Sequence, residues 1–455
     1  MVADFIRVEW DSILSLHEGD PTRSFENFDT QVNEIINSHA PLKKLSKKEL
    51  RINAKPWITE GIRKSIKRRD KLLRKYINMD DSDDKKQIYS RYKQLRNRIV
   101  ALTKISKKLH YQNYFQNNSK DIKKTWNGIK QIIDLRKCNR FQPSAIFIDH
   151  ELKSDPTEIA NNFNNYFANV GPNLQDKINT TGTDFMRYLK TPNNNCFLFE
   201  PADCQEILLL IDSLDENKST GPSSIPTDIL KVMKNNICYP LKELINISFA
   251  TGIYPSQLKA AKVTPIFKNK GDPLVVSNYR PISLLSNINK IFKKLVHQRL
   301  YSFLCKYNVI YELQFGFRSK HSTNHALISL TEMVRKAMDD GKFACGVFID
   351  LQKAFDTVDH TILLKKLEFY GVKGLANNWF KSYLSGRTQF TCINGFNSKI
   401  QNMKFGVPQG SVLGPLLFLL YINDLHSAIN FSSVHHFADD TNLLVSNISI
   451  KKNRN

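Results

Sequence analysis

The chain has 455 residues, 41% of them hydrophobic, which is ample for the packed cores of two or three domains and excludes a wholly disordered protein. Its net charge of +23 is unevenly spread, because residues 41–140 hold 30 Lys and Arg against 9 Asp and Glu, whereas the remainder holds 36 against 34. The seven cysteines include no Cys-x-x-Cys pair, which argues against a disulfide framework or a structural zinc site and favours a reducing intracellular compartment.

The first part of the chain is weakly patterned over residues 1–55 and strongly basic after that. From Ile58 to about Gln116 the pattern predicts long helices, interrupted by a turn at the acidic cluster of residues 80–84. Positive charge of this density attracts a polyanion, so we expect a nucleic acid as partner, with a solvated helical face as the alternative. Several aromatic residues lie between the basic ones and either stack on bases or pack between helices: Tyr89, Tyr92, Tyr111, Tyr114, Phe115 and Trp126.

The second part predicts a mixed α+β fold. Residues 141–200 contain a short amphipathic helix at Ile159–Phe167 and a linker at Pro192–Asn195, and from about residue 201 strands and helices alternate irregularly. Helices are expected at 361–372 and 376–384, followed by a hairpin of 388–393 and 398–404 around Asn394-Gly395. The longest apolar run, 412–422, is too short to cross a bilayer and predicts a buried helix. The N-terminus lacks the layout of a signal peptide.

Three acidic residues form the most informative pattern. Asp439 and Asp440 lie between strand-like runs at 433–436 and 442–445, which predicts a β-hairpin with two carboxylates at its turn. Such a pair alone is more often a solvated loop, but Asp350 ends an apolar run, 344–350, that is typical of a buried strand. Adjacent carboxylates repel unless a cation neutralises them, and Mg²⁺ prefers oxygen ligands. Two such strand ends can hold two metal ions about 3.5–4 Å apart.

Three blocks of sequence follow one another in a distinctive order: FIDLQKAFD at 348–356, GVPQGSVLGP at 406–415 and FADD at 437–440. In this order and spacing they resemble the reverse transcriptases of non-LTR retrotransposons of the LINE-type, jockey-like group. Segments at 55–59, 218–226, 263–272, 278–284 and 314–318 are also similar to these enzymes, so the likeness covers nearly the whole chain. Where the family usually has Asp-Gly, this chain has Ser223-Ser224.

The resemblance implies an α+β right-hand polymerase fold with fingers and a palm of antiparallel strands backed by helices. Residues 1–55 would be the remnant of a linker that follows an endonuclease, 56–140 a basic helical nucleic-acid-binding region and 141–200 a helical connector. The reverse transcriptase domain would span 201–455, with fingers at about 201–340 and an incomplete palm at about 341–455. The thumb and the endonuclease are not found in the chain, which we therefore expect to be a C-terminally truncated fragment.

The resemblance also implies roles for individual residues. Asp350, Asp439 and Asp440 match the catalytic ligands of two Mg²⁺ ions, with Mn²⁺ as an alternative, and the carbonyl of Leu351 commonly reaches a metal. Phe355 matches the aromatic gate that excludes the ribose 2′-hydroxyl. The remaining nucleotide-binding positions are Lys268 and Arg280 for the triphosphate, with Lys270 left open in place of Lys268, and Gln409 and Gly410 beside the incoming base.

The implied function is RNA-directed DNA synthesis, in which dNTPs are added to a primer 3′ end by two-metal nucleotidyl transfer. The expected partners are an RNA template, a DNA primer or target and dNTPs, together with other retrotransposon-encoded domains outside this chain, and no membrane. The expected location is the nucleus or a cytoplasmic ribonucleoprotein. Two alternatives stay open: a catalytically inactive RNA-binding remnant, and a related polymerase such as a group II intron-type maturase or a viral RNA-copying enzyme, the latter disfavoured by Phe355.

Overall fold

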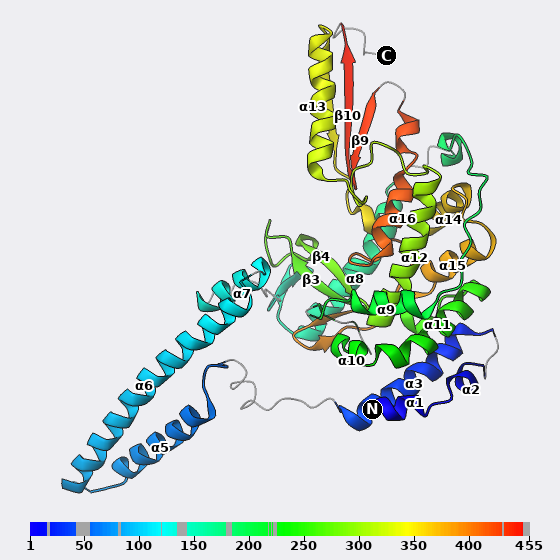
Figure 1. The fold of residues 1–455 in the computed structure, drawn as a ribbon. Helices are drawn as coiled ribbons and strands as arrows, with labels where there is room; N and C mark the ends of the chain where they lie inside the picture. Colours follow the sequence, from blue (N-terminus) through cyan, green and yellow to red (C-terminus); the bar gives the residue numbers. More distant parts are fainter. Residues whose placement is uncertain are drawn as a thin grey trace. The chain divides into compact units, whose positions relative to one another are not determined.

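The computed structural model describes residues 1–15, 19–41, 55–80, 83–119, 121–133, 143–178, 184–216, 218–219, 221, 225–429 and 432–448. The chain folds as two compact units (Figure 1): the first combines Met1–Ala40 with Gln142–Asn455, and the second is Pro41–Phe141. The first unit mixes helices with antiparallel and mixed sheets, which confirms the α+β class. The assignment of fingers and palm remains a prediction.

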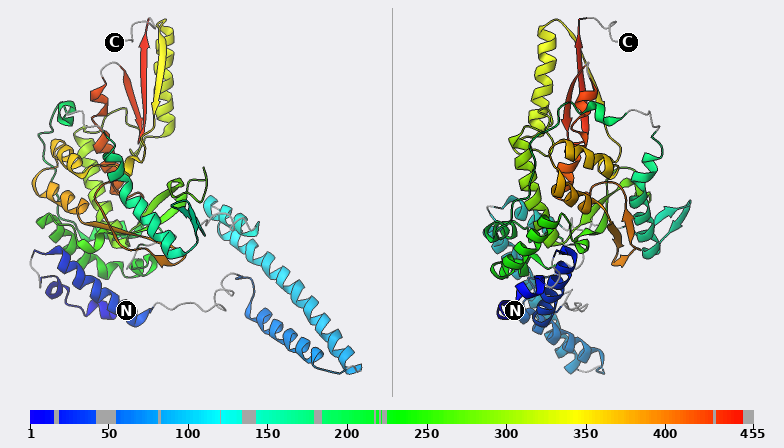
Figure 2. Two further views of the ribbon diagram at one scale, coloured as in Figure 1. Left: turned by 180° about the vertical axis from the view of Figure 1, so that it is seen from behind. Right: turned by 90° about the vertical axis from the view of Figure 1, so that its right-hand side faces the viewer.

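The second unit is built from the basic helices α5 (Glu60–Ile77), α6 (Asp83–Asn117) and α7 (Ile122–Ile132). The Thr59 hydroxyl accepts a hydrogen bond from the backbone N–H of Ile62 and so caps α5. Helices α5 and α6 lie side by side in both figures (blue and cyan in Figure 2). Tyr76 stacks on Tyr89 with ring centroids 4.7 Å apart. Several aromatic residues therefore hold the helices together, whereas the ring of Trp126 is 57% exposed.

One helical layer surrounds the larger core of the first unit. Here α3 (Pro21–His39) packs on α11 (Lys234–Thr251), so the weakly patterned N-terminal segment is helical and belongs to this core. Asp20 caps α3 by accepting hydrogen bonds from two backbone N–H groups of its first turn. The other helices of the layer are α1 (Val2–Ile6), α2 (Trp10–Ser15), α9 (Cys204–Asp212), α10 (Thr227–Val232), α12 (Asn287–Lys306), α14 (His360–Phe369), α15 (Gly374–Leu384) and α16 (Leu413–Ile422).

A mixed sheet lies next to these helices, in the order β4-β3-β6-β7 with β8 paired to β6. Strand β3 is antiparallel to β4 and parallel to β6. Helix α8 (Pro156–Gln175) packs on this sheet, and the rings of Phe163 and Tyr279 meet edge to face at 4.9 Å in its core. The strands are β3 (Ala260–Phe267), β4 (Tyr279–Leu284), β6 (Arg387–Ile393), β7 (Phe396–Asn397) and β8 (Gln401–Met403), and a separate pair is β1 (Ile146–Ile148) with β2 (Glu151–Lys153).

The expected hairpin around Asn394-Gly395 is confirmed. Ile393 pairs with Phe396, and both residues of the turn have positive φ, +52° and +89°. This is the backbone shape that Asn-Gly favours in a two-residue hairpin. The apolar run at 412–422 is confirmed as the buried helix α16. Within the described parts of the chain, we find no helix with the length and apolar character needed to cross a membrane.

A third sheet, in the order β5-β10-β9, carries the acidic hairpin. Its strands are β5 (Phe343–Ile349), β9 (Ser433–Phe437) and β10 (Asp440–Asn447), all antiparallel, and α13 (Thr323–Asp339) packs along them (Figure 1). The prediction of a buried strand at 344–350 is wrong, because all seven residues of β5 are exposed. Within the described residues β5 pairs with β10 alone (yellow beside red in Figure 2), which makes it an edge strand.

Candidate active site

The acidic pair lies at a tight two-residue turn. Phe437 pairs with Asp440, so Ala438 and Asp439 form the loop between β9 and β10. Ala438 has φ +58° at the first loop position, as hairpins whose turn matches the strand twist require. A non-glycine residue in this conformation is uncommon and indicates that surrounding contacts fix the turn. The backbone therefore holds Asp439 in one position.

The ladder between β5 and β10 brings the third acid to the same sheet end. Ile349 pairs with Thr441, so Asp350 follows directly beside Asp440. Burial raises the pKa of the Asp439 carboxyl, and the negative charges of Asp440 and then Asp350 raise it further. The three carboxylates are thus electrostatic neighbours. In the described part of the chain, however, no group of three His, Cys, Asp or Glu residues is gathered closely enough to hold a metal ion.

A segment far away in the sequence holds the acidic turn. The side-chain oxygen of Gln314 accepts hydrogen bonds from the backbone N–H of Ala438 at 3.0 Å and of Gly316 at 2.9 Å. Backbone bonds join the same segment to His436 on β9, at 2.8 Å and 3.0 Å. A Cβ on Gly316 would overlap the backbone of Ala438, so glycine permits this close approach. Residues 314–318 were predicted to lie in the fingers, and their contact with the acidic turn was not predicted.

The histidines next to the acids face opposite sides of the sheet. His435 Nε2 lies 3.0 Å from the Ser329 hydroxyl on α13, whereas His436 Nδ1 lies 3.0 Å from the Thr441 hydroxyl. Both residues are buried, and burial lowers the pKa of His436 to about 4, assisted by the nearby His426 and His435. His436 is therefore neutral at physiological pH and helps to pack the hairpin.

The loop at 406–411 docks on the turn that follows β5. The backbone N–H of Gly406 donates to the carbonyl of Val358 at 2.8 Å, and that of Val407 donates to Phe355 at 2.9 Å. Gly406 has φ +81°, and a Cβ there would meet the backbone of Phe355 and Asp356 at 2.9–3.0 Å. Glycine at 406 thus meets both a conformational and a steric need.

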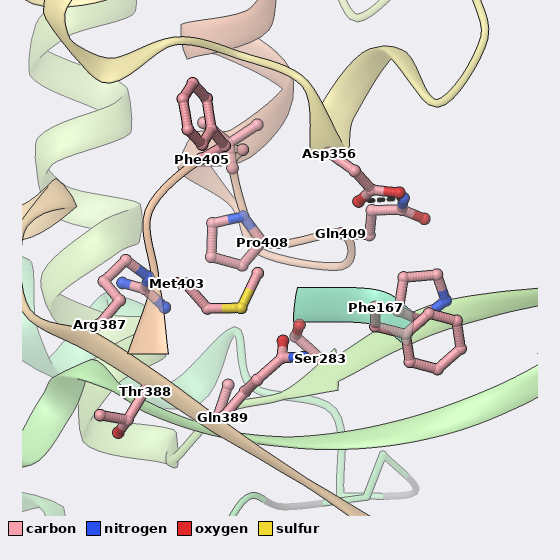
Figure 3. A pocket seen from close by; sticks show the side chains of 14 residues that line it. Phe167, Ser283, Asp356, Arg387, Thr388, Gln389, Met403, Phe405, Pro408 and Gln409 are labelled. Carbon is pink, nitrogen blue, oxygen red and sulfur yellow. Dashed lines mark hydrogen bonds between the residues drawn. The ribbon is translucent and has the colours of Figure 1, made fainter. Parts of the chain in front are cut away.

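This docking forms a small pocket of about 40 Å³ (Figure 3). In it the Gln409 side chain donates a hydrogen bond of 2.8 Å to one carboxylate oxygen of Asp356. The other oxygen of Asp356 is out of reach of solvent and has no hydrogen-bond partner among the described residues. Burial raises the pKa of Asp356, opposed by the Gln409 hydrogen bond and by Lys353 and Lys268. An unpartnered buried carboxylate oxygen is costly, so the pocket has spare capacity to accept a hydrogen bond.

Three cations gather beside this pocket. Burial lowers the pKa of Lys353, and the positive charges of Lys268 and Arg280 lower it further, against the opposing effect of Asp356. Lys268 also donates from Nζ to the carbonyl of Ser277 at 3.0 Å. Lys353 has φ +54°, which for a lysine requires support from its surroundings. The predicted residues Lys268 and Arg280 therefore lie together, and they have a third partner, Lys353, to which sequence analysis gave no role.

Phe355 lies between the acidic hairpin and the pocket. Its ring stacks on Phe418 of α16 at 4.7 Å and meets Phe317 edge to face at 5.9 Å. Phe317 follows Gly316, which touches the acidic turn, so this aromatic contact connects the two groups of predicted residues. Leu351 is half-buried against the same core. Gly410 has φ +91° and faces Ser283 of β4.

The predicted residues thus form two groups, the acids at one sheet end and the cations and Gln409 around the small pocket. Lys353, Asp356 and Gln314 were missed. Lys353 and Asp356 lay inside the block used to recognise the family, but their roles depend on contacts with segments about 50 to 90 residues away.

Of the block at 218–226, residues 220 and 222–224 lie outside the described residues.

Comparison with known proteins gives a consistent result. Residues 267–453 match the family model described as reverse transcriptase (RNA-dependent DNA polymerase). The chain is 32% identical over 301 residues to the probable RNA-directed DNA polymerase from transposon BS of Drosophila melanogaster, covering 65% of this chain and 32% of that protein. It is 30% identical over 276 residues to the RNA-directed DNA polymerase from mobile element jockey of the same fly, covering 58% and 29%.

A third relative is the probable RNA-directed DNA polymerase from transposon X-element of Drosophila melanogaster, 32% identical over 252 residues, with 53% of this chain and 27% of that protein covered. The chain therefore spans about a third of the length of these relatives. The sequence resemblance is confirmed. Residues 267–453 thus match the reverse transcriptase family, and the chain is similar to the RNA-directed DNA polymerases of non-LTR retrotransposons such as jockey.

Proposed function

We propose that the chain supplies the nucleotide-adding site of an RNA-directed DNA polymerase, which extends a DNA primer with dNTPs along an RNA template. The observation that carries this proposal is the meeting of Asp350, Asp439 and Asp440 at one end of the β5-β10-β9 sheet. Burial and the neighbouring negative charges raise the pKa of Asp439, and a cation bound between the carboxylates would offset both effects.

The donor chemistry fits Mg²⁺, or Mn²⁺ in its place, because carboxylates are hard oxygen donors. The three acids are neighbours at one sheet end but are not drawn together as a preformed metal cluster among the described residues, so metal binding would have to bring them closer. Asp350, Asp439 and Asp440 would hold the two ions, with the carbonyl of Leu351 as a further donor. When bound, such ions activate the primer 3′-hydroxyl and neutralise charge on the phosphates. The hairpin contributes by fixing Asp439 through the Ala438 turn and the Gln314 contact.

The residues around Gln409 would contact the incoming nucleotide at its base. Lys268, Arg280 and Lys353 would hold the triphosphate, because cations beside the β- and γ-phosphates offset their charge, and arginine can do so through two parallel hydrogen bonds. Asp356 would fix Gln409 beside the base. The ring of Phe355, braced by Phe418, would exclude a ribose 2′-hydroxyl.

Primer extension by the full chain tests the proposal. The assay uses an RNA template, a DNA primer, dNTPs and Mg²⁺, and compares the unaltered chain with Asp439→Asn and with Asp176→Asn, which removes an exposed carboxylate at the end of α8. We expect Asp439→Asn to lower the extension rate by about 100-fold or more, and Asp176→Asn to leave it unchanged. Equal extension by all three proteins would contradict the metal assignment.

A second candidate function is RNA binding without catalysis. It is favoured by one observation, the concentration of positive charge in residues 41–140, since this unit attracts nucleic acid whether or not the acids act. If the chain only binds RNA, the unaltered chain would bind RNA and would not extend a primer with either Mg²⁺ or Mn²⁺. The same assay, combined with an RNA-binding measurement, therefore separates the two functions.

A further inference from the structure

A second cavity lies next to the small pocket around Gln409, where β4 meets the loop at 406–411. It has a volume of about 320 Å³ and is bounded by the end of β4, the start of α12, residues 213–215 and 218–219, and the loop at 410–412. Ser283 lines both cavities, and its backbone N–H donates to the carbonyl of Gln409 at 3.0 Å. The two cavities are therefore neighbours that share a lining residue.

Four lysines line this second cavity, which we call the lysine pocket: Lys218, Lys290, Lys293 and Lys294. The last three come from the first turns of α12, where spacings of three and four residues place side chains on one face. Among the described lining residues, Asp215 is the single carboxylate, and none of the four lysines forms an ion pair with a described acidic residue. The pocket therefore carries a surplus of positive charge.

The hydrogen bonds of these lysines do not neutralise that charge. Lys294 Nζ donates to the Ser213 hydroxyl at 2.8 Å, and Lys290 Nζ donates to the Asn287 side chain at 3.1 Å. Lys293 is fully buried, and its Nζ has no hydrogen-bond partner among the described residues. The Lys293 Nζ lies 5.2 Å from the centre of the Tyr383 ring. A buried amine without a hydrogen-bond acceptor is costly, so the pocket has capacity for an anionic partner.

The pKa values of the lysines agree with this geometry. Burial lowers the pKa of Lys290 and Lys294, and the charge of Lys218 lowers both further. Burial also lowers the pKa of Lys293 well below its usual value, assisted by the buried Arg387. An anion in the pocket would remove these penalties together, since each lysine would gain an opposite charge nearby.

We propose that the lysine pocket binds phosphate groups. Phosphate groups offer strong acceptor oxygens that carry negative charge, which several lysine ammonium groups can share as point charges. Two sources are available next to a nucleotide-adding site: the backbone of a nucleic-acid strand that continues past the Gln409 loop, or free pyrophosphate. The choice of these sources rests on the proposed function, whereas phosphate binding itself does not.

The test compares three variants of the full chain with the unaltered chain. Lys290→Gln/Lys294→Gln removes two cations of the pocket, and Lys306→Gln/Lys381→Gln removes two exposed cations elsewhere in the same unit as a matched control. Lys293→Met removes the buried amine while keeping the side chain's volume, so a merely structural lysine would be replaced with no loss of folding or binding. Two probes are titrated into each protein: a fluorescent single-stranded RNA, followed by anisotropy, and pyrophosphate, followed by the shift in thermal unfolding.

We expect the pocket variants to bind at least one probe roughly tenfold more weakly than the unaltered chain, and the control pair to bind both normally. Weaker RNA binding alone identifies the nucleic-acid backbone as the source, and loss of the pyrophosphate shift alone identifies the free anion. Unchanged binding of both probes by the pocket variants would overturn the proposal. The proposal would also be overturned if the unaltered chain bound polyglutamate but neither RNA nor pyrophosphate. The Asp439→Asn variant should bind both probes as the unaltered chain does. Loss of primer extension is therefore distinguishable from loss of phosphate binding in the lysine pocket.

Discussion

At the scale of single residues, the position of Asp439 determines the chemistry that the hairpin can perform. Its carboxyl is half-buried, and its pKa is raised by burial and by two neighbouring negative charges. A divalent cation would convert that repulsion into attraction. We therefore expect Mg²⁺ to stabilise the unaltered chain against thermal unfolding, by about 1.4 kcal/mol at ten times the dissociation constant. Asp439→Asn and Asp350→Asn should lose most of this stabilisation.

The matched control for the metal prediction is Asp176→Asn, which should keep the full stabilisation by Mg²⁺. Calorimetry with and without Mg²⁺ measures the effect independently of activity. An equal shift in all variants would show that Mg²⁺ acts elsewhere on the chain, and the assignment of the three acids would then be wrong.

Lys353 combines an unusual backbone conformation with a positive charge at the proposed nucleotide-binding site. Its φ of +54° suits asparagine better than most residues, so Lys353→Asn removes the cation while preserving the local backbone. We expect the KM for dNTPs to rise about tenfold, because one of the three cations proposed to hold the triphosphate is lost, with unchanged thermal stability. Steady-state primer extension over a range of dNTP concentrations measures the change. A variant that lost stability but kept its KM would indicate a structural role instead.

His436 makes the stability of the hairpin depend on pH. Its pKa is about 4 in the folded protein against 6.5 when exposed. Because the unfolded chain binds the proton first, stability is fully present above pH 6.5 and falls as the pH drops towards 4, by roughly 3 kcal/mol. Urea unfolding at pH 7 and pH 4.5 should show a smaller loss for His436→Gln than for the unaltered chain. Equal losses would contradict the assigned pKa.

At the scale of elements, the acidic hairpin depends on a contact with residues 314–316. Gln314→Ala would leave the buried N–H groups of Ala438 and Gly316 without their acceptor, at a cost of about 1–3 kcal/mol each. Gly316→Ala would push the turn away, because its Cβ overlaps Ala438. We expect both variants to slow primer extension more than they raise the KM for dNTPs. Gln298→Ala, an exposed glutamine on α12, is the control and should leave the rate unchanged.

These elements show what the sequence could predict and what it could not. The hairpin at 437–440 and the Asn394-Gly395 turn were predicted because local patterns specify them: strand-like runs on either side of a short polar turn. Strand β5 was expected to be buried because its residues are apolar, but exposure depends on which elements cover a strand, and that is a property of the whole fold. The Gln314–Ala438 contact joins residues 124 positions apart and leaves no local signal.

At the scale of the whole molecule, charge and acid chemistry lie in different units. The unit Pro41–Phe141 holds most of the excess positive charge, whereas the acids and the pocket belong to the unit of Met1–Ala40 and Gln142–Asn455. Aromatic residues such as Tyr76 and Tyr89 are used for packing between α5 and α6. The exposed lysines and arginines of these helices are therefore the groups available for a polyanion, and binding through them should be electrostatic and independent of sequence.

This separation predicts that RNA binding and its salt dependence follow the basic unit. We compare a set on α5, Lys67, Arg68, Lys71 and Arg74, all changed to Gln, with a set of exposed lysines in the other unit, Lys306, Lys336, Lys365 and Lys381, also changed to Gln. Each phosphate contact contributes about 0.7 to the slope of log affinity against log salt for single strands. Losing four contacts should therefore reduce the slope by roughly 3 in the α5 set and leave it nearly unchanged in the other set. Equal reductions in both sets would mean that binding follows net charge alone, and binding that ignores salt would refute the electrostatic basis of the interaction.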